Sequence, residues 1–335
     1  MLEIMISDMK VLIIGCGSIG RRHLRNLNSL GVRDFILCDT DMRRLEEAAA
    51  GVTGPRPRLT TDFKEALSAG PHAAVVATPS SMHLSMGLEL AKSGVHMLME
   101  KPLSHTLAGV EELIRAVEDR GVIAMMAMCY RFHPVMLHVK NLLDSSILGK
   151  VYHANYYGGH YLPDWHPDAD YRREYAARRD LGGGVILTSI HSLDNIRWFF
   201  GEPETVEAFT DRVSGLEMDV EDIATGIFRM ESGIYVNWAS DFLQRANQHR
   251  MVIAGERGTV RCDFLDGTLE TYLAETKGWT IVKVPFEVNG MYVAEMRHFL
   301  ECVVKKSGAV LNLSDGYRTL KFALKVKGSG DKRRG

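Results

Sequence analysis

Short, almost wholly apolar runs alternate with longer amphipathic segments in the N-terminal part of the chain. Such runs lie at residues 10–14, 34–38, 73–77, 95–99 and 123–128. Runs of this length, rich in Val, Ile, Leu and Met, are typical of strands buried on both faces of a parallel sheet. The segment that carries Leu24, Leu27 and Leu30 has the spacing of a helix. This alternation predicts a doubly wound α/β domain.

The pattern changes in the second half, where short strand-like runs predominate. They are separated by turns containing Gly or Asp and lie at residues 151–157, 205–212, 224–230, 234–239, 251–254, 259–262 and 280–284. Helices are predicted as well, over residues 185–200, about 290–306 and about 314–327. The last two are expected to pack on this second domain. We place the domains at residues 1–125 and 126–328, with a polar tail at 329–335.

A glycine-rich motif, GCGSIG, follows the first apolar run directly and leads into the first helix. Gly15 allows a tight turn, and Gly17 lets the backbone approach a pyrophosphate closely. Gly20 allows the helix to pack against the strand. The helix begins near Ser18 and Ile19, where unpaired N–H groups and the positive end of the helix dipole favour an anion. In this context the motif predicts a dinucleotide-binding site.

The second apolar run ends in Asp39, about 20 residues beyond the glycines, where a carboxylate accepts hydrogen bonds from ribose hydroxyls. The same carboxylate repels a 2′-phosphate, so Asp39 favours NAD over NADP. Arg43 and Arg44 follow closely. They either offset this preference or lie on a solvated helix face, and NADP therefore stays open.

Two further strands end in polar residues. In an open α/β sheet ligands bind at the carboxyl ends of the strands, so these residues are expected near the nicotinamide. They are Thr78, Pro79, Ser80, His83, Glu100 and Lys101. Hydride transfer from an alcohol also needs a group that removes the hydroxyl proton. Lys101 is the first candidate, because partial desolvation and the positive charge of the nicotinamide favour the neutral amine that a base requires.

Composition limits the class of partner. The 335 residues are 46% hydrophobic and 24% charged with a formal net charge of −2, so we expect a small molecule rather than a nucleic acid or a membrane. The five cysteines form no C-x-x-C pair, which fits a reducing compartment. The N-terminus lacks the pattern of a signal peptide, and no apolar run reaches the length of a membrane span. We expect a cytoplasmic protein.

Several motifs together resemble the glucose–fructose oxidoreductase/inositol dehydrogenase (Gfo/Idh/MocA) family. They are GCGSIGRRH, ATPSSMH, EKP at residues 100–102, YRFHP at 130–134 and LGGGVILTSIHSLDNIRWFFG at 181–201. The resemblance implies a Rossmann domain followed by an α+β domain with a large, open, mostly antiparallel sheet. It also implies a homodimer or homotetramer formed through the outer face of that sheet. The stretch YLPDWHPDADYRREYAARRDLGGG resembles the branch associated with sugar or nucleotide-sugar metabolism.

The same resemblance supports Lys101 as a catalytic residue and adds His191, whose family counterpart contacts the substrate hydroxyl. Asp194 lies three residues on and so on the same helix face. The family's acid, three or four residues before the histidine, is here Thr188 or Leu187, so no carboxylate orients the site from that position. Thr188 can bind substrate but cannot act as a base. His191 is a catalytic or substrate-binding residue, or else a core histidine.

The segment from residue 157 to 179 is dense in aromatic and charged side chains, as long loops that serve a site often are. The candidates for substrate binding are Lys101, Thr188 and His191, together with Tyr157, His160, Trp165 and Tyr171. Aromatic faces suit a sugar ring, and the arginines of this segment suit a phosphate or a carboxylate. The histidines and acids match no metal-ligand spacing, so no metal is expected. Arg131 and His133 of YRFHP are expected beside the cofactor or the substrate, and Arg131 is counted among the cofactor-binding residues.

These features predict an NAD(P)-dependent dehydrogenase or reductase that acts on a hydroxyl or keto group of a sugar, a nucleotide sugar or a cyclitol. One alternative is a redox-neutral enzyme that retains NAD, such as an epimerase or a glycosidase-like enzyme. Another is a regulator that senses NAD(P) or a sugar on the same scaffold. Net production of NADH separates the first alternative from a dehydrogenase, and failure of every substrate to reduce NAD favours the second.

Overall fold

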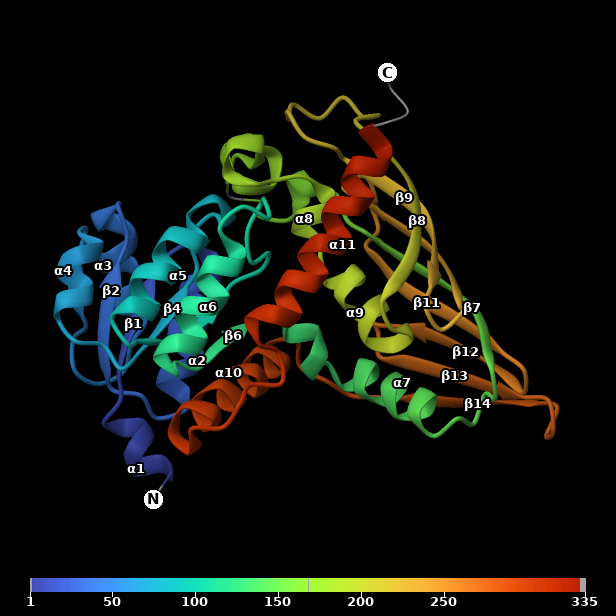
Figure 1. Cartoon of the computed structure of the whole chain (residues 1–335), viewed down its shortest axis with the longest axis horizontal. Helices are drawn as coiled ribbons and strands as arrows, with labels where there is room; N and C mark the ends of the chain where they lie inside the picture. The colour runs from blue at the N-terminus through green and yellow to red at the C-terminus, as the bar shows by residue number, and fades with distance from the viewer. Residues whose placement is uncertain (1, 168, 332–335) are drawn as a thin grey trace. The chain divides into compact units, whose positions relative to one another are not determined.

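The computed structural model describes residues 2–167 and 169–331 of the protein (Figure 1). Contacts between Cα atoms divide the chain into two compact units. The first comprises the residues up to Cys129 together with Val288–Arg318, and the second comprises Tyr130–Glu287 together with the residues from Thr319 onward. The functional division into domains at residues 1–125 and 126–328 stays a prediction.

The described part of the first unit contains a six-stranded sheet in the order β3-β2-β1-β4-β5-β6, in which every neighbouring pair is parallel. The strands are β1 (Lys10–Ile14), β2 (Asp34–Cys38), β3 (Arg58–Thr60), β4 (Ala73–Val76), β5 (His96–Met99) and β6 (Ala124–Met126). The central strands are buried along almost their whole length, because helices cover both faces. The predicted doubly wound parallel sheet is confirmed.

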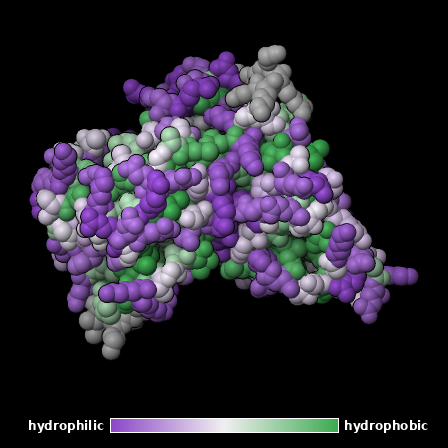
Figure 2. All heavy atoms as spheres, viewed as in Figure 1, coloured by the Kyte–Doolittle hydropathy of each residue, from purple (hydrophilic) through white to green (hydrophobic). Residues whose placement is uncertain are grey.

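Amphipathic helices surround this sheet. They are α1 (Leu2–Ser7), α2 (Ser18–Ser29), α3 (Met42–Ala50), α4 (Phe63–Ser68), α5 (His83–Lys92), α6 (Val110–Arg120) and α10 (Val288–Lys305), with a short 3₁₀ turn η1 (Ser80–Met82) before α5. Hydrophilic side chains predominate over the visible surface of these helices, as expected when their apolar faces turn to the sheet (Figure 2).

The position of α10 differs from our expectation that it packs on the second domain. It packs against α1 and α2 of the first unit. Asn26 of α2 and Asn289 of α10 exchange two side-chain hydrogen bonds, of 3.3 and 2.9 Å. Helical periodicity shows which face of a helix is apolar but not which neighbour covers it, so the sequence pattern could not identify this partner.

The described part of the second unit contains an eight-stranded sheet in the order β14-β13-β12-β11-β7-β10-β9-β8. The strands are β7 (Val151–Gly159), β8 (Pro203–Asp211), β9 (Ile223–Met230), β10 (Tyr235–Asp241), β11 (Gln248–Gly255), β12 (Gly258–Asp263), β13 (Thr268–Leu273) and β14 (Gly278–Lys283). All neighbours are antiparallel except β7 and β10, which run parallel. The large, mostly antiparallel sheet implied by the family resemblance is confirmed.

Helices cover one face of the second sheet. They are α7 (Pro134–Asp144), α8 (Val185–Thr188), α9 (His191–Phe200) and α11 (Leu313–Asp331), of which α11 lies in the second unit from Thr319 onward; the turn η2 (Cys129–Phe132) precedes α7. Phe322 of α11 packs edge to face on Phe228 of β9, with ring centroids 4.8 Å apart. Trp238 of β10 donates its indole N–H to Ser192 Oγ of α9 at 2.9 Å. The buried residues of the strands alternate with exposed ones, so the opposite face is open.

Two predicted segments differ from the structure. The helix predicted over residues 185–200 is broken between Thr188 and His191 into α8 and α9, because Ser189 leaves the helical region with φ −95° and ψ 25°. Helix α11 continues to Asp331, so the first residues of the predicted polar tail are helical, and residues 332–335 lie outside the described part. No helix in the described part of the chain is long and apolar enough to cross a membrane.

Candidate active site

The glycine motif forms a backbone cradle between β1 and α2. Gly15 has φ 90°, and a Cβ atom there would lie 2.5 Å from the carbonyl oxygen of Ala77. A Cβ atom on Gly20 would lie 1.9 Å from the carbonyl oxygen of Gly15. A Cβ atom on Gly17 would meet no heavy atom within 4 Å, and no side chain caps the first turn of α2. The cradle therefore leaves open space beside free helix N–H groups, which fits a dinucleotide pyrophosphate.

Asp39 lies at the end of β2 and is held in one orientation by two backbone groups. The Cys16 N–H donates to its Oδ2 at 2.7 Å, and the Asp41 N–H donates to its Oδ1 at 3.0 Å. Arg43 and Arg44 both lie near the Asp41 carboxylate, at 3.6 and 3.9 Å. A 2′-phosphate at this position would meet two carboxylates, one of which already attracts both arginines, so the arrangement fits a ribose with free hydroxyls.

The two candidate segments at the ends of β4 and β5 are tied together by His83. Its Nδ1 lies 2.8 Å from the Pro102 carbonyl oxygen and its Nε2 lies 2.9 Å from the Thr78 carbonyl oxygen. The ring is buried, and burial lowers the pKa of His83. Pro79 and the buried Ser80 lead from Thr78 into η1. His83 therefore holds these strand ends in place; a direct contact of any of these residues with the cofactor stays a prediction.

Behind Lys101 lies a buried group of acids and a histidine. Glu100 Oε1 lies 2.7 Å from His23 Nε2, and Glu100 Oε2 accepts a hydrogen bond of 3.1 Å from the Lys101 backbone N–H. Glu295 of α10 is fully buried nearby, and burial, together with the negative charge of Glu100, raises the pKa of Glu295 well above its ordinary value. The sequence analysis did not identify His23 or Glu295, although the RRH continuation of the glycine motif carries His23, which is buried on α2.

In the second unit, His191 is the first residue of α9 and packs against Tyr130. The two ring centroids are 4.8 Å apart at 74°. The Asp194 carboxylate, expected on the same helix face, accepts hydrogen bonds of 2.7 and 3.0 Å from Arg131 and one of 3.0 Å from Thr319. Asp194 and Arg131 therefore anchor the start of α9. A contact between Arg131 and the cofactor stays a prediction.

Four residues that the sequence analysis did not identify extend this cluster: Tyr130, Tyr156, Asn195 and His249. Tyr130 packs on His249 with ring centroids 5.0 Å apart. Tyr156 Oη lies 2.6 Å from His249 Nε2 and accepts a hydrogen bond of 3.1 Å from Asn195 Nδ2. Tyr156 and His249 are 93 positions apart in the chain, so no local motif could have connected them.

The candidates for substrate binding differ in their burial and in their contacts within the protein. Tyr157 donates to Asp241 Oδ2 at 3.0 Å, and burial raises the pKa of Tyr157 to about 12. The rings of His160 and Trp165 lie 4.6 Å apart, and 40% of Trp165 is exposed. Tyr171 instead accepts a hydrogen bond from the Glu217 N–H at 3.0 Å, which holds the loop together. Thr188 is buried at the end of α8.

Three of the four arginines of the same loop bind other groups of the protein. Arg172 binds Asp170 at 2.8 Å, and Arg178 binds Asp180 at 2.6 Å. Arg179 donates to the Asp219 carbonyl oxygen at 2.7 Å. The charges of Arg172 and Arg178 are thus neutralised by neighbouring carboxylates. Among the residues that the structure describes, no group of histidine, cysteine and acidic side chains has the arrangement of a metal site.

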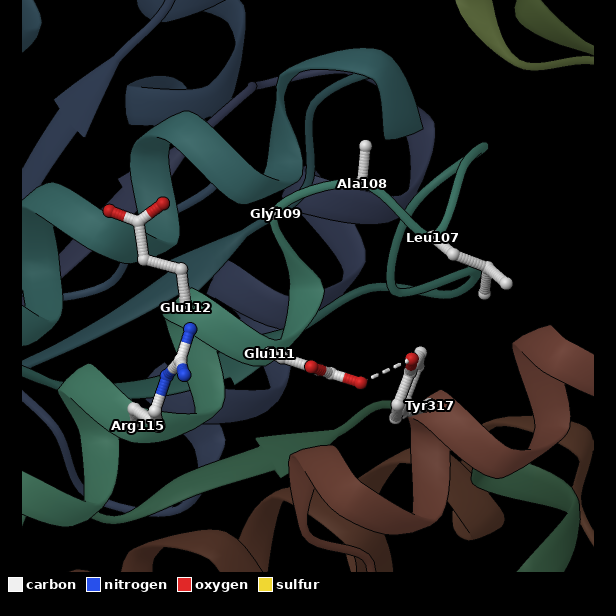
Figure 3. Close-up of a pocket in the computed structure, with 7 residues that line it drawn as sticks. All are labelled: Leu107, Ala108, Gly109, Glu111, Glu112, Arg115 and Tyr317. Carbon is white, nitrogen blue, oxygen red and sulfur yellow. Dashed lines mark hydrogen bonds between the residues drawn. The ribbon is translucent and has the colours of Figure 1, made fainter.

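A separate hollow of about 450 Å³ lies in the first unit at the start of α6 (Figure 3). Its lining consists of Leu107, Ala108, Gly109, Glu111, Glu112, Arg115 and Tyr317. The Tyr317 hydroxyl donates to Glu111 Oε1 at 2.9 Å across one side of it. Its lining contains none of the candidate residues and no residue of the glycine cradle, so we do not assign it to the active site.

The glycine cradle, the oriented Asp39 and the lysine at the end of β5 define a dinucleotide-binding oxidoreductase. The family model described as "Oxidoreductase family, NAD-binding Rossmann fold" matches residues 9–128, and the model described as "GFO/IDH/MocA C-terminal domain" matches residues 136–261. The chain belongs to the Gfo/Idh/MocA family of oxidoreductases, as its motifs indicate, and its cofactor is NAD.

Individual relatives agree with this assignment. D-apiose dehydrogenase of Paraburkholderia graminis is 28% identical over 340 residues, which cover 94% of this chain and 86% of that protein. The scyllo-inositol 2-dehydrogenase (NAD(+)) of Bacillus subtilis is 26% identical over 306 residues, covering 88% and 86%. This chain is also similar to a solved structure of levoglucosan dehydrogenase in complex with NADH and levoglucosan, with a TM-score of 0.85 at 18% identity. The match covers 97% of both chains and shows that the two proteins share a fold.

Proposed function

We propose that this protein is an NAD-dependent dehydrogenase that oxidises a secondary hydroxyl group of a neutral sugar or cyclitol, or reduces the corresponding ketone. The observation that carries the proposal is Lys101 at the carboxyl end of β5, backed by the buried Glu100–His23 pair, in the unit that contains the glycine cradle. Relatives named as dehydrogenases of D-apiose and scyllo-inositol support the substrate class.

Bound NAD would supply the acceptor for the hydride of the carbinol carbon. In the oxidative direction Lys101 Nζ accepts the hydroxyl proton, and in the reductive direction it returns that proton. His191 hydrogen-bonds a hydroxyl group of the substrate and orients it. The hydrogen bond from the Lys101 N–H to Glu100 fixes the backbone from which the lysine side chain extends, which supports Lys101 as the proton-transfer group.

The loop arginines favour a neutral substrate over a nucleotide sugar. A nucleotide diphosphate carries negative charge that arginines ordinarily bind through bidentate hydrogen bonds. Here the guanidinium groups of Arg172 and Arg178 already bind the aspartates two positions away. The paired aromatic rings of His160 and Trp165 offer instead a surface suited to a sugar ring.

We further propose a cytoplasmic homodimer or homotetramer. The open face of the second sheet exposes Phe209, Ile227, Tyr235 and Ile281, each more than half exposed. Apolar side chains gathered on one sheet face mark a protein interface. The five cysteines are all buried and free, which fits a reducing compartment. Light scattering of the purified protein tests the assembly; a monomer at micromolar concentration would contradict it.

A dehydrogenase screen tests the function. The purified protein is assayed with NAD and NADP in parallel against cyclitols, aldoses and nucleotide sugars, and net NADH production is recorded. We expect a cyclitol or aldose to give net NADH, with NAD preferred by more than about tenfold, a ratio worth about 1.4 kcal/mol. Retained cofactor with no net NADH would favour redox-neutral chemistry. Failure of all substrates, with NADH still bound, would favour a sensor.

A further inference from the structure

Three buried side chains of the second unit form a directed chain of hydrogen bonds. Asn195 of α9, Tyr156 of β7 and His249 of β11 are 0%, 1% and 8% exposed. The Asn195 Nδ2 group lies 3.1 Å from Tyr156 Oη, and Tyr156 Oη lies 2.6 Å from His249 Nε2. None of them belongs to the glycine cradle or to the loop with the substrate candidates.

The donors in this chain determine where the protons lie. An amide nitrogen only donates, so the oxygen of Tyr156 accepts the hydrogen bond from Asn195. The single phenolic proton of Tyr156 is then directed to His249 Nε2, which must be unprotonated to accept it. Burial lowers the pKa of His249 to about 3, so the ring is neutral and its one proton lies on Nδ1. The chain thus holds His249 in one tautomer.

Ring contacts link His249 to His191. Tyr130 lies between them, with ring centroids 5.0 Å from His249 and 4.8 Å from His191, both in edge-to-face geometry. His191 and Asn195 are four residues apart on α9 and so lie on one face of it. These contacts therefore form a continuous path from Asn195 of α9 through Tyr156 of β7, His249 of β11 and Tyr130 back to His191 of α9.

Stability alone does not explain this polar chain. The Asn195 Oδ1 atom is buried and makes no hydrogen bond within the described part of the chain. A buried polar atom in that state costs about 1–3 kcal/mol. Apolar residues of similar shape would avoid that cost. The three hydrogen-bonded residues therefore serve to fix side-chain orientation rather than to increase stability.

We propose that Tyr156, His249 and Tyr130 are positioning residues that hold the His191 ring in the orientation needed to hydrogen-bond the substrate hydroxyl. The proposal rests on the proposed function, in which His191 binds that hydroxyl. Tyr156 fixes His249, His249 fixes the Tyr130 ring, and the Tyr130 ring restricts rotation of the His191 side chain. None of the three contacts the reacting atoms.

Substitutions separate the hydrogen bond from the ring contact. H249Q keeps an acceptor for Tyr156 but removes the ring that supports Tyr130, and Y156F removes the hydroxyl but keeps both rings. Because misplacement of a binding group by about 1 Å costs on the order of 100-fold, we expect H249Q to lower kcat by about 10- to 100-fold and Y156F by less. The KM for NAD should stay unchanged. Y152F, at a half-exposed tyrosine of the same strand, is the control and should match the wild type.

A second readout needs no substrate. Protein with ¹⁵N-labelled histidine is titrated by NMR, first to assign the tautomer of His249 and then to follow His191 in the wild type, H249Q and Y156F. We expect His249 to carry its proton on Nδ1, and we expect the His191 titration to shift in H249Q and Y156F but not in Y152F. If H249Q does not fold, H249M, which also removes the ring that supports Tyr130, replaces it, with the same expected shift.

The two readouts distinguish the possible failures. An unshifted His191 titration, or a shifted titration with wild-type kcat, would overturn the positioning role. A proton on His249 Nε2 would overturn it as well. A wild type that oxidises no alcohol would remove the proposed function, and the NMR comparison would then decide the positioning role by itself.

Discussion

The buried polar groups behind Lys101 differ in ionisation from the hydrogen-bonded set Asn195–Tyr156–His249 of the second unit. Around Lys101 the first unit buries ionisable acids, Glu100 and Glu295, with His23 beside them. Beside His191 the second unit also buries the ion pair of Arg131 and Asp194. Its Tyr156 and His249 are neutral, because burial lowers the pKa of His249 to about 3 and raises the pKa of Tyr156. Buried acids can bind and release protons, whereas neutral rings and amides fix the orientation of the side chains they contact. The comparison supports the proposal that Lys101 transfers a proton and that the groups around His191 fix its orientation.

The largest effect on stability is expected at the buried Arg131–Asp194 ion pair of the second unit. D194L leaves a buried guanidinium without its carboxylate, which costs about 3–5 kcal/mol of unfolding free energy. The control is D144A, which removes an exposed ion pair with Lys140 and should cost at most about 1 kcal/mol. Urea unfolding measures both; a D194L protein as stable as D144A would show that the pair does not anchor α9.

Acid should weaken the second unit through its neutral histidines. Burial lowers the pKa of His133 to about 4 and that of His249 to about 3, whereas both groups titrate near 6.5 in the unfolded chain. Between these values the unfolded chain binds protons that the folded protein does not. The free energy of unfolding should therefore fall as pH drops below about 6.5, by about 1.4 kcal/mol per pH unit for each histidine.

Hydrogen exchange of β11 peptides between pH 7 and 5 measures this loss, after correction for the intrinsic pH dependence of exchange. H249F should flatten the slope, because it removes one of the two groups. A slope in H249F equal to that of the wild type would show that His249 is not held neutral in the folded protein.

The glycine cradle allows a matched pair of substitutions in the first unit. G20A places a methyl group 1.9 Å from the Gly15 carbonyl oxygen, so the backbone must shift, at about 1–3 kcal/mol of stability. G17A places its methyl group in open space and should leave the melting temperature near that of the wild type. Both should weaken NADH binding by more than about tenfold. Fluorescence titration tests this; wild-type affinity in G17A would place the pyrophosphate elsewhere.

The smallest expected effect concerns Glu295. Its pKa is raised in the folded protein above the unfolded value of about 4.3, so above that pH the unfolded chain releases a proton that the folded protein keeps. Stability should therefore fall as pH rises, and E295Q should remove this slope and make the protein more stable at pH 8. The control is E301Q, at an accessible glutamate of the same helix, which should keep the wild-type slope. A loss of stability in E295Q at pH 8 would show that the carboxyl group is ionised.

The same contrast explains how much could be predicted from the sequence. The residues around the glycine cradle lie in short continuous segments, and buried parallel strands have a clear apolar pattern, so strands β1, β2, β4, β5 and β6 and their strand-end residues were predicted. Strand β3 was missed, because it has three residues and only one of them is buried. Glu295 was missed because a carboxylate in an amphipathic helix is ordinarily exposed. Neither its burial nor the packing partner of α10 is encoded in a local pattern.

The second unit was harder to predict because its contacts are long-range. Asp194 and Thr319 are 125 positions apart, and Arg131 and Asp194 are 63. Strand β13 was missed because its residues are mostly polar or half-exposed. The break between α8 and α9 was missed because apolar residues continue on both sides of Ser189. His191 was found through the resemblance to the family rather than through its surroundings.

Lys101 is the residue on which the proposed function depends most directly. The decisive measurement is the single-turnover rate of hydride transfer to NAD in K101A, with the alcohol identified by the screen, beside the Kd for NADH. Removal of a proton-transfer group lowers the rate by about 10²- to 10⁴-fold. We predict a loss in that range with the Kd unchanged within a factor of about three, while K92A, at an exposed lysine of α5, behaves as the wild type. Hydride transfer by K101A at the wild-type rate would contradict the assignment.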